Sequence, residues 1–148
     1  MGHQSYQLLI EVRRPVCIRV GRLGTFRFPA GRYVYTGSAT RNLEARIARH
    51  LGARQRLRWH IDFLLAAPGS RVARVRRSRL PECAFNQSAR GAILVAGFGA
   101  SDCRAGCGSH LKYRGHQAGS GSPAGVALTT PRHRGSSAPS LGRTACRS

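Results

Sequence analysis

Tyrosines, an arginine and a histidine follow one another closely in the first third of the chain, and their types suit chemistry on a phosphate group. Tyr33 and Tyr35 precede a Thr-Gly-Ser turn, and Arg46 and His50 lie four positions apart just beyond it. Residues at this spacing share one face of a helix. A guanidinium binds two phosphate oxygens at once, and an imidazole accepts or donates a proton near neutral pH. The group indicates phosphate chemistry, although an arginine and a histidine on a basic helix are often simply solvated.

The charge of the chain supports an anionic partner. The 148 residues include 25 Lys and Arg but only five Asp and Glu, which gives a formal net charge of +20 and a pI near 11.8. An imbalance of this size favours binding to a polyanion, and nucleic acid is the leading candidate. No apolar run approaches the roughly 18 residues of a membrane span, and no export signal is recognisable. We therefore expect a cytoplasmic protein without a membrane partner.

The elements that must position these residues begin with strands. Alternating or apolar β-prone stretches cover residues 4–12, 16–20, 25–28 and 32–36, with a Pro-Ala-Gly turn signal before the last. These stretches predict a small antiparallel meander. The length of the chain favours one folded domain.

A helix is predicted directly after the tyrosine strand. Leu43, Ile47 and Leu51 recur at helical spacing and form the expected apolar stripe beside Arg46 and His50. Thr40 or Asn42 would cap its first turn, and Gly52 would end it.

The later elements complete an α+β pattern. A buried helix is expected over residues 57–67, a strand over 71–77, and a third helix opening at residues 80–82. Residues 92–96 are apolar and ambiguous. We expect an antiparallel or mixed sheet flanked by helices.

Composition changes near residue 115. Residues 115–148 contain no acid, no aromatic residue and no sustained apolar period. Such a segment cannot bury enough apolar surface to fold. We predict a domain over residues 1–114 and a disordered basic tail over 115–148.

Several separated sequence blocks resemble a known nuclease family. Ser5-Tyr6, the Y-T-G at 35–37 and the following Arg46 and His50 look like the GIY-YIG endonuclease signature. The blocks V-G-R-L-G-T-F-R-F-P-A-G-R-Y-V-Y-T-G-S-A, W-H-I-D-F-L-L, and G-F-G-A-S-D-C followed by S-H-L resemble a small prokaryotic branch of that superfamily, sometimes fused to endonuclease III. The similarity covers roughly residues 5 to 113.

The resemblance implies a metal-dependent endonuclease that hydrolyses phosphodiester bonds in DNA, with DNA repair as the expected setting. It implies a three-stranded antiparallel sheet, catalytic roles for Tyr6, Tyr35, Arg46 and His50, and a Mg²⁺ or Mn²⁺ ligand at Glu82. One carboxylate suffices, because water completes the shell of a magnesium ion. We also expect four nucleic-acid contacts, at Gly37, Ser38, Arg41 and Arg49.

One departure from the family pattern leaves an alternative open. The first motif normally contains Gly-x-Tyr, whereas this chain has Gln4-Ser5-Tyr6. A glycine that permits close backbone approach is therefore missing. The chain is then also interpretable as a non-catalytic nucleic-acid-binding module of the same fold. A third interpretation is a basic protein that binds ribosomal RNA or an acidic protein.

Two further groups of residues have metal-binding or polar character. Cys103, Cys107 and His110 have a C-x3-C-x2-H spacing, to which Cys83 or His116 would add a fourth zinc ligand. The spacing alone favours reduced thiols, and a Zn²⁺ site there is not the expected outcome.

The block Trp59-His60-Ile61-Asp62 places an imidazole and a carboxylate on a helix predicted to be buried. Buried polar groups are normally paired. We interpret Asp62 as the partner of a nearby arginine.

Overall fold

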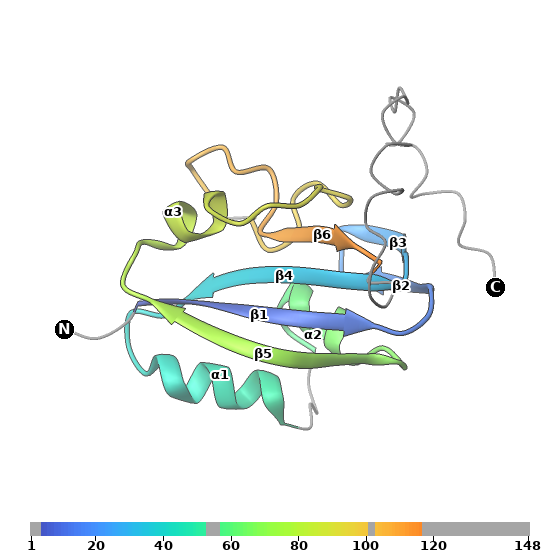
Figure 1. The fold of residues 1–148 in the computed structure, drawn as a ribbon, viewed down its shortest axis with the longest axis horizontal. Coiled ribbons are helices and arrows are strands. Elements are labelled where there is room, and N and C mark those ends of the chain that lie inside the picture. The colour runs from blue at the N-terminus through green and yellow to red at the C-terminus, as the bar shows by residue number, and fades with distance from the viewer. Residues whose placement is uncertain (1–3, 53–56, 101–102, 117–148) are drawn as a thin grey trace.

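The computed structural model describes residues 4–52, 57–100 and 103–116 and has the predicted α+β architecture (Figure 1). The elements in chain order are β1 (Ser5–Val12), β2 (Val16–Val20), β3 (Gly24–Phe28), β4 (Gly31–Ser38), α1 (Leu43–Leu51), α2 (His60–Leu65), β5 (Ser70–Ser78), α3 (Glu82–Gln87) and β6 (Leu111–Gly115). The predicted tail lies outside the described residues from residue 117 onward. Among the described residues, no helix is both long and apolar enough to cross a membrane.

The main sheet has four strands in the order β5-β1-β4-β6, and all neighbours are antiparallel. β2 and β3 form a separate two-stranded sheet. The predicted meander is therefore wrong. β1 pairs directly with β4, and the β2-β3 hairpin, which lies between these strands in the chain, is not part of the main sheet. β1 is central in this order, and it is apolar on both faces over Leu8, Leu9 and Ile10, which suits a strand covered on both faces of the sheet.

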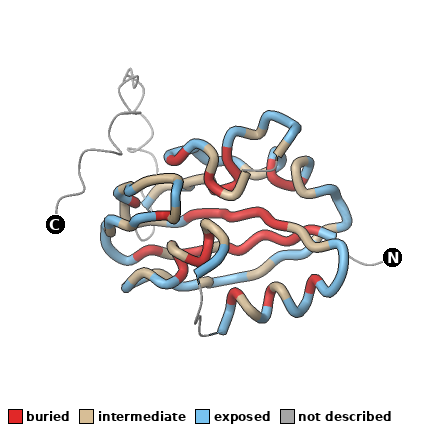
Figure 2. The backbone as a smooth tube through the Cα atoms, turned by 180° about the vertical axis from the view of Figure 1, so that it is seen from behind, coloured by how far each residue is buried: buried red, intermediate tan, exposed pale blue. Residues whose placement is uncertain are grey.

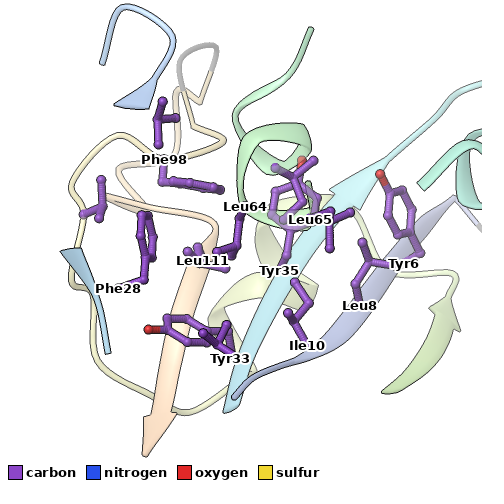
Figure 3. Packing of buried hydrophobic residues seen from close by; sticks show 14 of the residues in the cluster. Tyr6, Leu8, Ile10, Phe28, Tyr33, Tyr35, Leu64, Leu65, Phe98 and Leu111 are labelled. Atoms are coloured by element: carbon purple, nitrogen blue, oxygen red, sulfur yellow. The ribbon is translucent and has the colours of Figure 1, made fainter. Parts of the chain in front are cut away.

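The core lies on one face of this sheet. Tyr6, Leu8 and Ile10 point to that face from β1, since alternate residues of a strand share a side. Tyr33 and Tyr35 join them from β4 (Figure 3). Buried residues follow the two central strands almost without interruption (Figure 2). The sheet therefore gives the tyrosines a rigid apolar support.

Helix α1 forms as predicted, from Leu43 to Leu51. The Asn42 side chain accepts a hydrogen bond from the backbone N–H of Ala45, and the N–H of Gly52 closes the last turn. The predicted apolar stripe is wrong in its last member, because Leu51 is 54% exposed whereas His50 is 1% exposed. The imidazole therefore faces the core from α1.

Helix α2 is shorter than predicted and begins at His60. Asp62 accepts hydrogen bonds from the backbone N–H groups of Arg58 and Trp59, which fixes the chain just before the helix. Residues 92–96 form no strand, although Ala92 makes an isolated bridge to Tyr113. Tyr113 lies on β6, which the sequence patterns did not predict and which adds a fourth strand to the three that the resemblance implied.

Candidate functional site

A cavity of about 300 Å³ opens where β1 and β4 meet α1 and α3. Its lining contains six of the nine residues predicted for the site: Tyr6, Tyr35, Gly37, Ser38, Arg46 and Glu82. Four further lining residues were not predicted as site residues: Arg58, Trp59, His60 and Gly99. The pocket, as we call this cavity, thus combines phenol, guanidinium, imidazole and carboxylate groups in one place.

Tyr6 and His50 form a buried polar pair at the base of the pocket. The Tyr6 hydroxyl lies 2.7 Å from His50 Nε2, and both residues are only 1% exposed. Gly37 is the partner of Tyr6 in the β1–β4 register. A Cβ at Gly37 would lie 2.6 Å from the Tyr6 hydroxyl oxygen, so only glycine leaves room for that group.

Both pocket tyrosines keep their protons at neutral pH. Burial raises the pKa of Tyr6, and the Arg46 charge opposes this shift only partly. Burial also raises the pKa of Tyr35 well above its usual value. The two side chains are therefore neutral phenols in the resting protein, not phenolates.

Arg46 and Glu82 face each other across Ser38. Arg46 Nη1 donates a hydrogen bond of 3.0 Å to the Ser38 carbonyl oxygen, and the Ser38 hydroxyl donates to Glu82 Oε1. Glu82 Oε2 lies 2.6 Å from His110 Nδ1. Burial alone would raise the pKa of Glu82, but the contacts with His110 and Ser38 hold it below its usual range. Glu82 is an anion at neutral pH and the one carboxylate among the described residues that line the pocket.

Trp59 forms a platform for three guanidinium groups. Arg46, Arg49 and Arg58 lie 4.6, 4.4 and 5.5 Å from its ring centroid, within the range of cation–π attraction. The His50 ring also meets Trp59 edge-on at 5.9 Å. The aromatic ring therefore holds positive charge beside the pocket. The block W-H-I-D was the sequence signal for it, but spacing alone did not connect that block to Arg46.

The structure separates the remaining predicted contacts from the pocket. Arg49 makes a bidentate ion pair with Asp62, at 2.9 and 3.1 Å, so it supports the wall and does not line the cavity. This confirms the interpretation of Asp62 as the partner of a nearby arginine. Arg41 is exposed and also outside the lining. His50 lies behind the lining, where its Nε2 contacts Tyr6 and its ring meets those of Tyr35 and Trp59.

His60 presents a defined tautomer. Its Nδ1 accepts a hydrogen bond of 2.8 Å from the backbone N–H of Gly99, so in the neutral ring the proton is on Nε2. Burial lowers the pKa of His60, which favours the neutral ring at pH 7. His60 is therefore a further N–H donor in the pocket wall.

A larger hollow of about 500 Å³ is lined by Arg32, Arg74 and Arg114 together with residues of β1 and β4. Its one acid among the described lining residues is Glu11, which pairs with Arg71 at the surface. It contains Tyr33 and His116, but its carboxylate is already paired with Arg71, and none of the nine residues predicted for the site lines it. We therefore place the candidate site in the pocket.

A group of thiols lies behind Glu82. The metal-binding atoms of Cys83, Cys103, Cys107 and His110 all lie within 4.8 Å of one another, and this set is able to hold a metal ion. Of the two residues considered as a fourth ligand, Cys83 joins the group and His116 does not. Backbone N–H groups of Cys107 and Ala105 lower the pKa of Cys103. We refer to these four residues as the thiol cluster.

Comparison with known proteins gives one match. A family model described as a domain of unknown function, DUF123, matches residues 5–123. Neither the curated proteins nor the solved structures contain a match to this chain. The match begins with β1 and includes every described helix and strand.

Proposed function

The chain belongs to the DUF123 family, and we propose that it is a GIY-YIG-type, metal-dependent endonuclease that hydrolyses phosphodiester bonds in DNA. The observation that carries this proposal is the pocket itself. Tyr6, Arg46 and Glu82 come from β1, α1 and α3 and line one cavity of about 300 Å³. Groups far apart in the sequence thus converge on one cavity, which supports the binding of a backbone phosphate there.

Arg46 suits the phosphate oxygens. A guanidinium has five N–H donors, and the contact with Ser38 uses one of them. The Trp59 ring holds the guanidinium plane on one side, so its orientation is fixed before a ligand arrives. Arg46 would bind the phosphate oxygens and stabilise the charge that develops on them during in-line attack.

Tyr6 and His50 suit the transfer of a proton. As water attacks the phosphorus, its proton would pass to the Tyr6 oxygen while the Tyr6 proton passes to His50 Nε2, which lies 2.7 Å away. The other ring nitrogen of His50 faces the Asp62 carboxylate at 4.0 Å, an attraction that stabilises the resulting imidazolium. The bond from phosphorus to the leaving oxygen then breaks. The raised pKa of Tyr6 favours this relay over a free phenolate.

Glu82 fits a hydrated Mg²⁺ or Mn²⁺ ion. Its side chain is 28% exposed and lies in the pocket wall, and Ser38 and His110 fix its orientation. Each carboxylate oxygen has two acceptor sites, so these contacts leave capacity for a metal ion. Bound there, the ion would neutralise negative charge on the phosphate and the leaving oxygen.

DNA outside the pocket would meet a basic edge strand. β5 is an edge of the main sheet, and Arg74 and Arg76 are exposed on it. Neighbouring exposed arginines neutralise phosphates without reading bases. We therefore expect little sequence preference from this surface.

The proposal is tested by incubating purified protein with nicked, branched and abasic DNA in the presence of Mg²⁺ or Mn²⁺. Arg46→Ala should lower the single-turnover cleavage rate by about 100- to 1,000-fold, because it removes a charged donor from the transition state. Glu82→Ala should abolish metal-dependent cleavage. Arg41→Ala is the matched control, since this arginine is exposed and outside the lining. Cleavage that persists unchanged in both pocket variants would refute the proposal.

The burial of Tyr6 and His50 favours a second candidate, a non-catalytic nucleic-acid-binding module. Groups that are only 1% exposed need some opening to reach a substrate. This candidate predicts binding without cleavage of any of the three DNA substrates. In both cases the dissociation constant should rise steeply with salt concentration, because phosphate contacts release counterions. A weak salt response would instead favour an acidic protein partner.

A further inference from the structure

The thiol cluster has the dimensions of a four-coordinate metal site. Cys83 Sγ lies 3.6 Å from Cys103 Sγ and 4.0 Å from His110 Nε2, and all four ligand atoms lie within 4.8 Å of one another. In a tetrahedral zinc site with Zn–S bonds of about 2.3 Å, the sulfur atoms are about 3.8 Å apart. The donor atoms are therefore already near the separations that zinc requires.

The orientation of His110 is an independent observation. This residue is 2% exposed, its Nε2 faces the thiols, and its Nδ1 lies 2.6 Å from Glu82 Oε2. Histidines that bind a metal commonly direct the opposite ring N–H at a carboxylate, which fixes both tautomer and ring position. The contact with Glu82 leaves Nε2 as the coordinating nitrogen.

The cluster also lies where the fold has little other support. The described residues between α3 and β6, 88–100 and 103–110, contain no helix or strand beyond the isolated bridge at Ala92. Long irregular segments are uncommon in compact domains unless a ligand or a function fixes them. Cys83 lies on α3, whereas Cys103, Cys107 and His110 belong to the irregular segment, so one ion would fasten that segment to the helix.

We propose that Cys83, Cys103, Cys107 and His110 bind one Zn²⁺ ion in a closed, structural site, and that Glu82 is a positioning residue for His110. Three thiolates and one imidazole are a donor set typical of structural zinc, with no open position for water. The proposal goes beyond the nuclease function and does not depend on it. It also gives Glu82 a second role, because the same carboxylate lines the pocket and contacts His110, the proposed zinc ligand.

The test measures the metal content of the full chain, purified under reducing conditions without added metal. We expect about one zinc per chain by elemental analysis. His110→Ala and Cys107→Ser should lose most of this zinc. His116→Ala is the matched control and should retain it, because His116 is an exposed histidine outside the cluster. Wild-type protein that purifies without zinc and binds none on titration would overturn the proposal.

A second measurement does not depend on the folding of any variant. Wild-type protein reconstituted with Co²⁺ should show the intense visible d–d bands of a tetrahedral site and a thiolate-to-cobalt charge-transfer band. A pale octahedral cobalt spectrum would overturn the assignment. So would a Cys83–Cys103 disulfide detected by mass spectrometry in freshly prepared protein, since it would consume two ligands.

The role of Glu82 is tested by zinc affinity. Competition with a chromophoric chelator should show that Glu82→Gln lowers the affinity about 10- to 100-fold. Ser38→Ala is the control, because it removes the contact with the other oxygen of the same carboxylate and leaves Oε2 beside His110. Equal affinities of the Glu82→Gln and wild-type proteins would contradict the positioning role.

Discussion

The pocket and the thiol cluster lie on two sides of Glu82, yet different forces hold them in place. Regular elements fix the pocket, because Tyr6 comes from a central strand and Arg46 from a capped helix packed on the sheet. The thiol cluster instead joins the first turn of α3 to an irregular segment. The difference teaches that backbone pairing positions the polar groups of the pocket, whereas the thiol cluster lies on a segment without such pairing, which the proposed ion would order.

The largest expected effect tests whether buried polar contacts hold the pocket wall. Asp62 is fully buried and binds Arg49 and the N–H groups of Arg58 and Trp59. We expect Asp62→Ala to lower the free energy of unfolding by about 3 kcal/mol, because it leaves donors unpaired. Urea denaturation measures this cost.

The matched control for that change is Glu11→Ala. Glu11 pairs with Arg71 at the surface, so its loss should cost less than about 1 kcal/mol. Equal losses of unfolding free energy in the two variants would mean that Asp62 does not support the pocket wall. The pocket would then not differ from the thiol cluster in how it is held in place.

The next largest expected effect tests whether the space left by Gly37 positions Tyr6 in the pocket. A Cβ at Gly37 would lie 2.6 Å from the Tyr6 hydroxyl oxygen, so we expect Gly37→Ala to destabilise the fold by about 2 kcal/mol. It should also lower cleavage by displacing Tyr6. Gly52→Ala is the control, since its Cβ would meet nothing nearer than the Ala48 oxygen at 3.4 Å. Full activity of the Gly37→Ala protein would show that the position of Tyr6 is unimportant.

A smaller change separates stability from chemistry. Tyr6→Phe removes the hydrogen bond to His50, and Tyr33→Phe removes a bond of 2.6 Å to the Pro29 carbonyl oxygen outside the pocket. Each should cost about 1 kcal/mol of unfolding free energy. Only Tyr6→Phe should also lower the cleavage rate. If the two variants cleave DNA equally well, Tyr6 has no part in the reaction.

The smallest expected effect concerns pH. Burial alone would raise the pKa of Asp62, but hydrogen bonds from Arg49 and from the backbone of Trp59 and Arg58 lower it below its usual value. Ionised Asp62 therefore stabilises the fold fully above its unfolded pKa of about 3.9, and this stabilisation is lost as the pH falls through the folded pKa. The urea midpoint of the wild type should decline below about pH 4, and the decline should be shallower in Asp62→Asn. Parallel pH profiles of the two proteins would contradict this assignment.

The sequence predicted the elements whose signals are local. Helix α1 has its periodicity, its Asn42 cap and its Gly52 end within one segment, and its bounds agree with the structure. The pairing of β1 with β4 across the hairpin was missed, because strand order depends on contacts between segments far apart in the chain. Leu51 was placed in the core and His50 outside it, since periodicity does not distinguish the last exposed leucine of a helix from a buried polar residue.

The residues of the candidate site were predictable only where they belong to a recognisable sequence motif. Tyr6, Arg46 and Glu82 were named from the family resemblance, and the structure brings them to one cavity. The platform of Trp59 and Arg58 was missed because it depends on which arginines the fold brings to the Trp59 ring from α1. The approach of Cys83 to Cys103 depends on the path of an irregular segment, which has no sequence period.

The most direct test of the central claim is a crystal structure with Mn²⁺ and a short DNA carrying a non-hydrolysable phosphate analogue. The account predicts a manganese anomalous peak beside the Glu82 carboxylate, and one backbone phosphate in the pocket within hydrogen-bond distance of Arg46. DNA bound across the larger hollow instead, or a pocket without metal and phosphate, would contradict it.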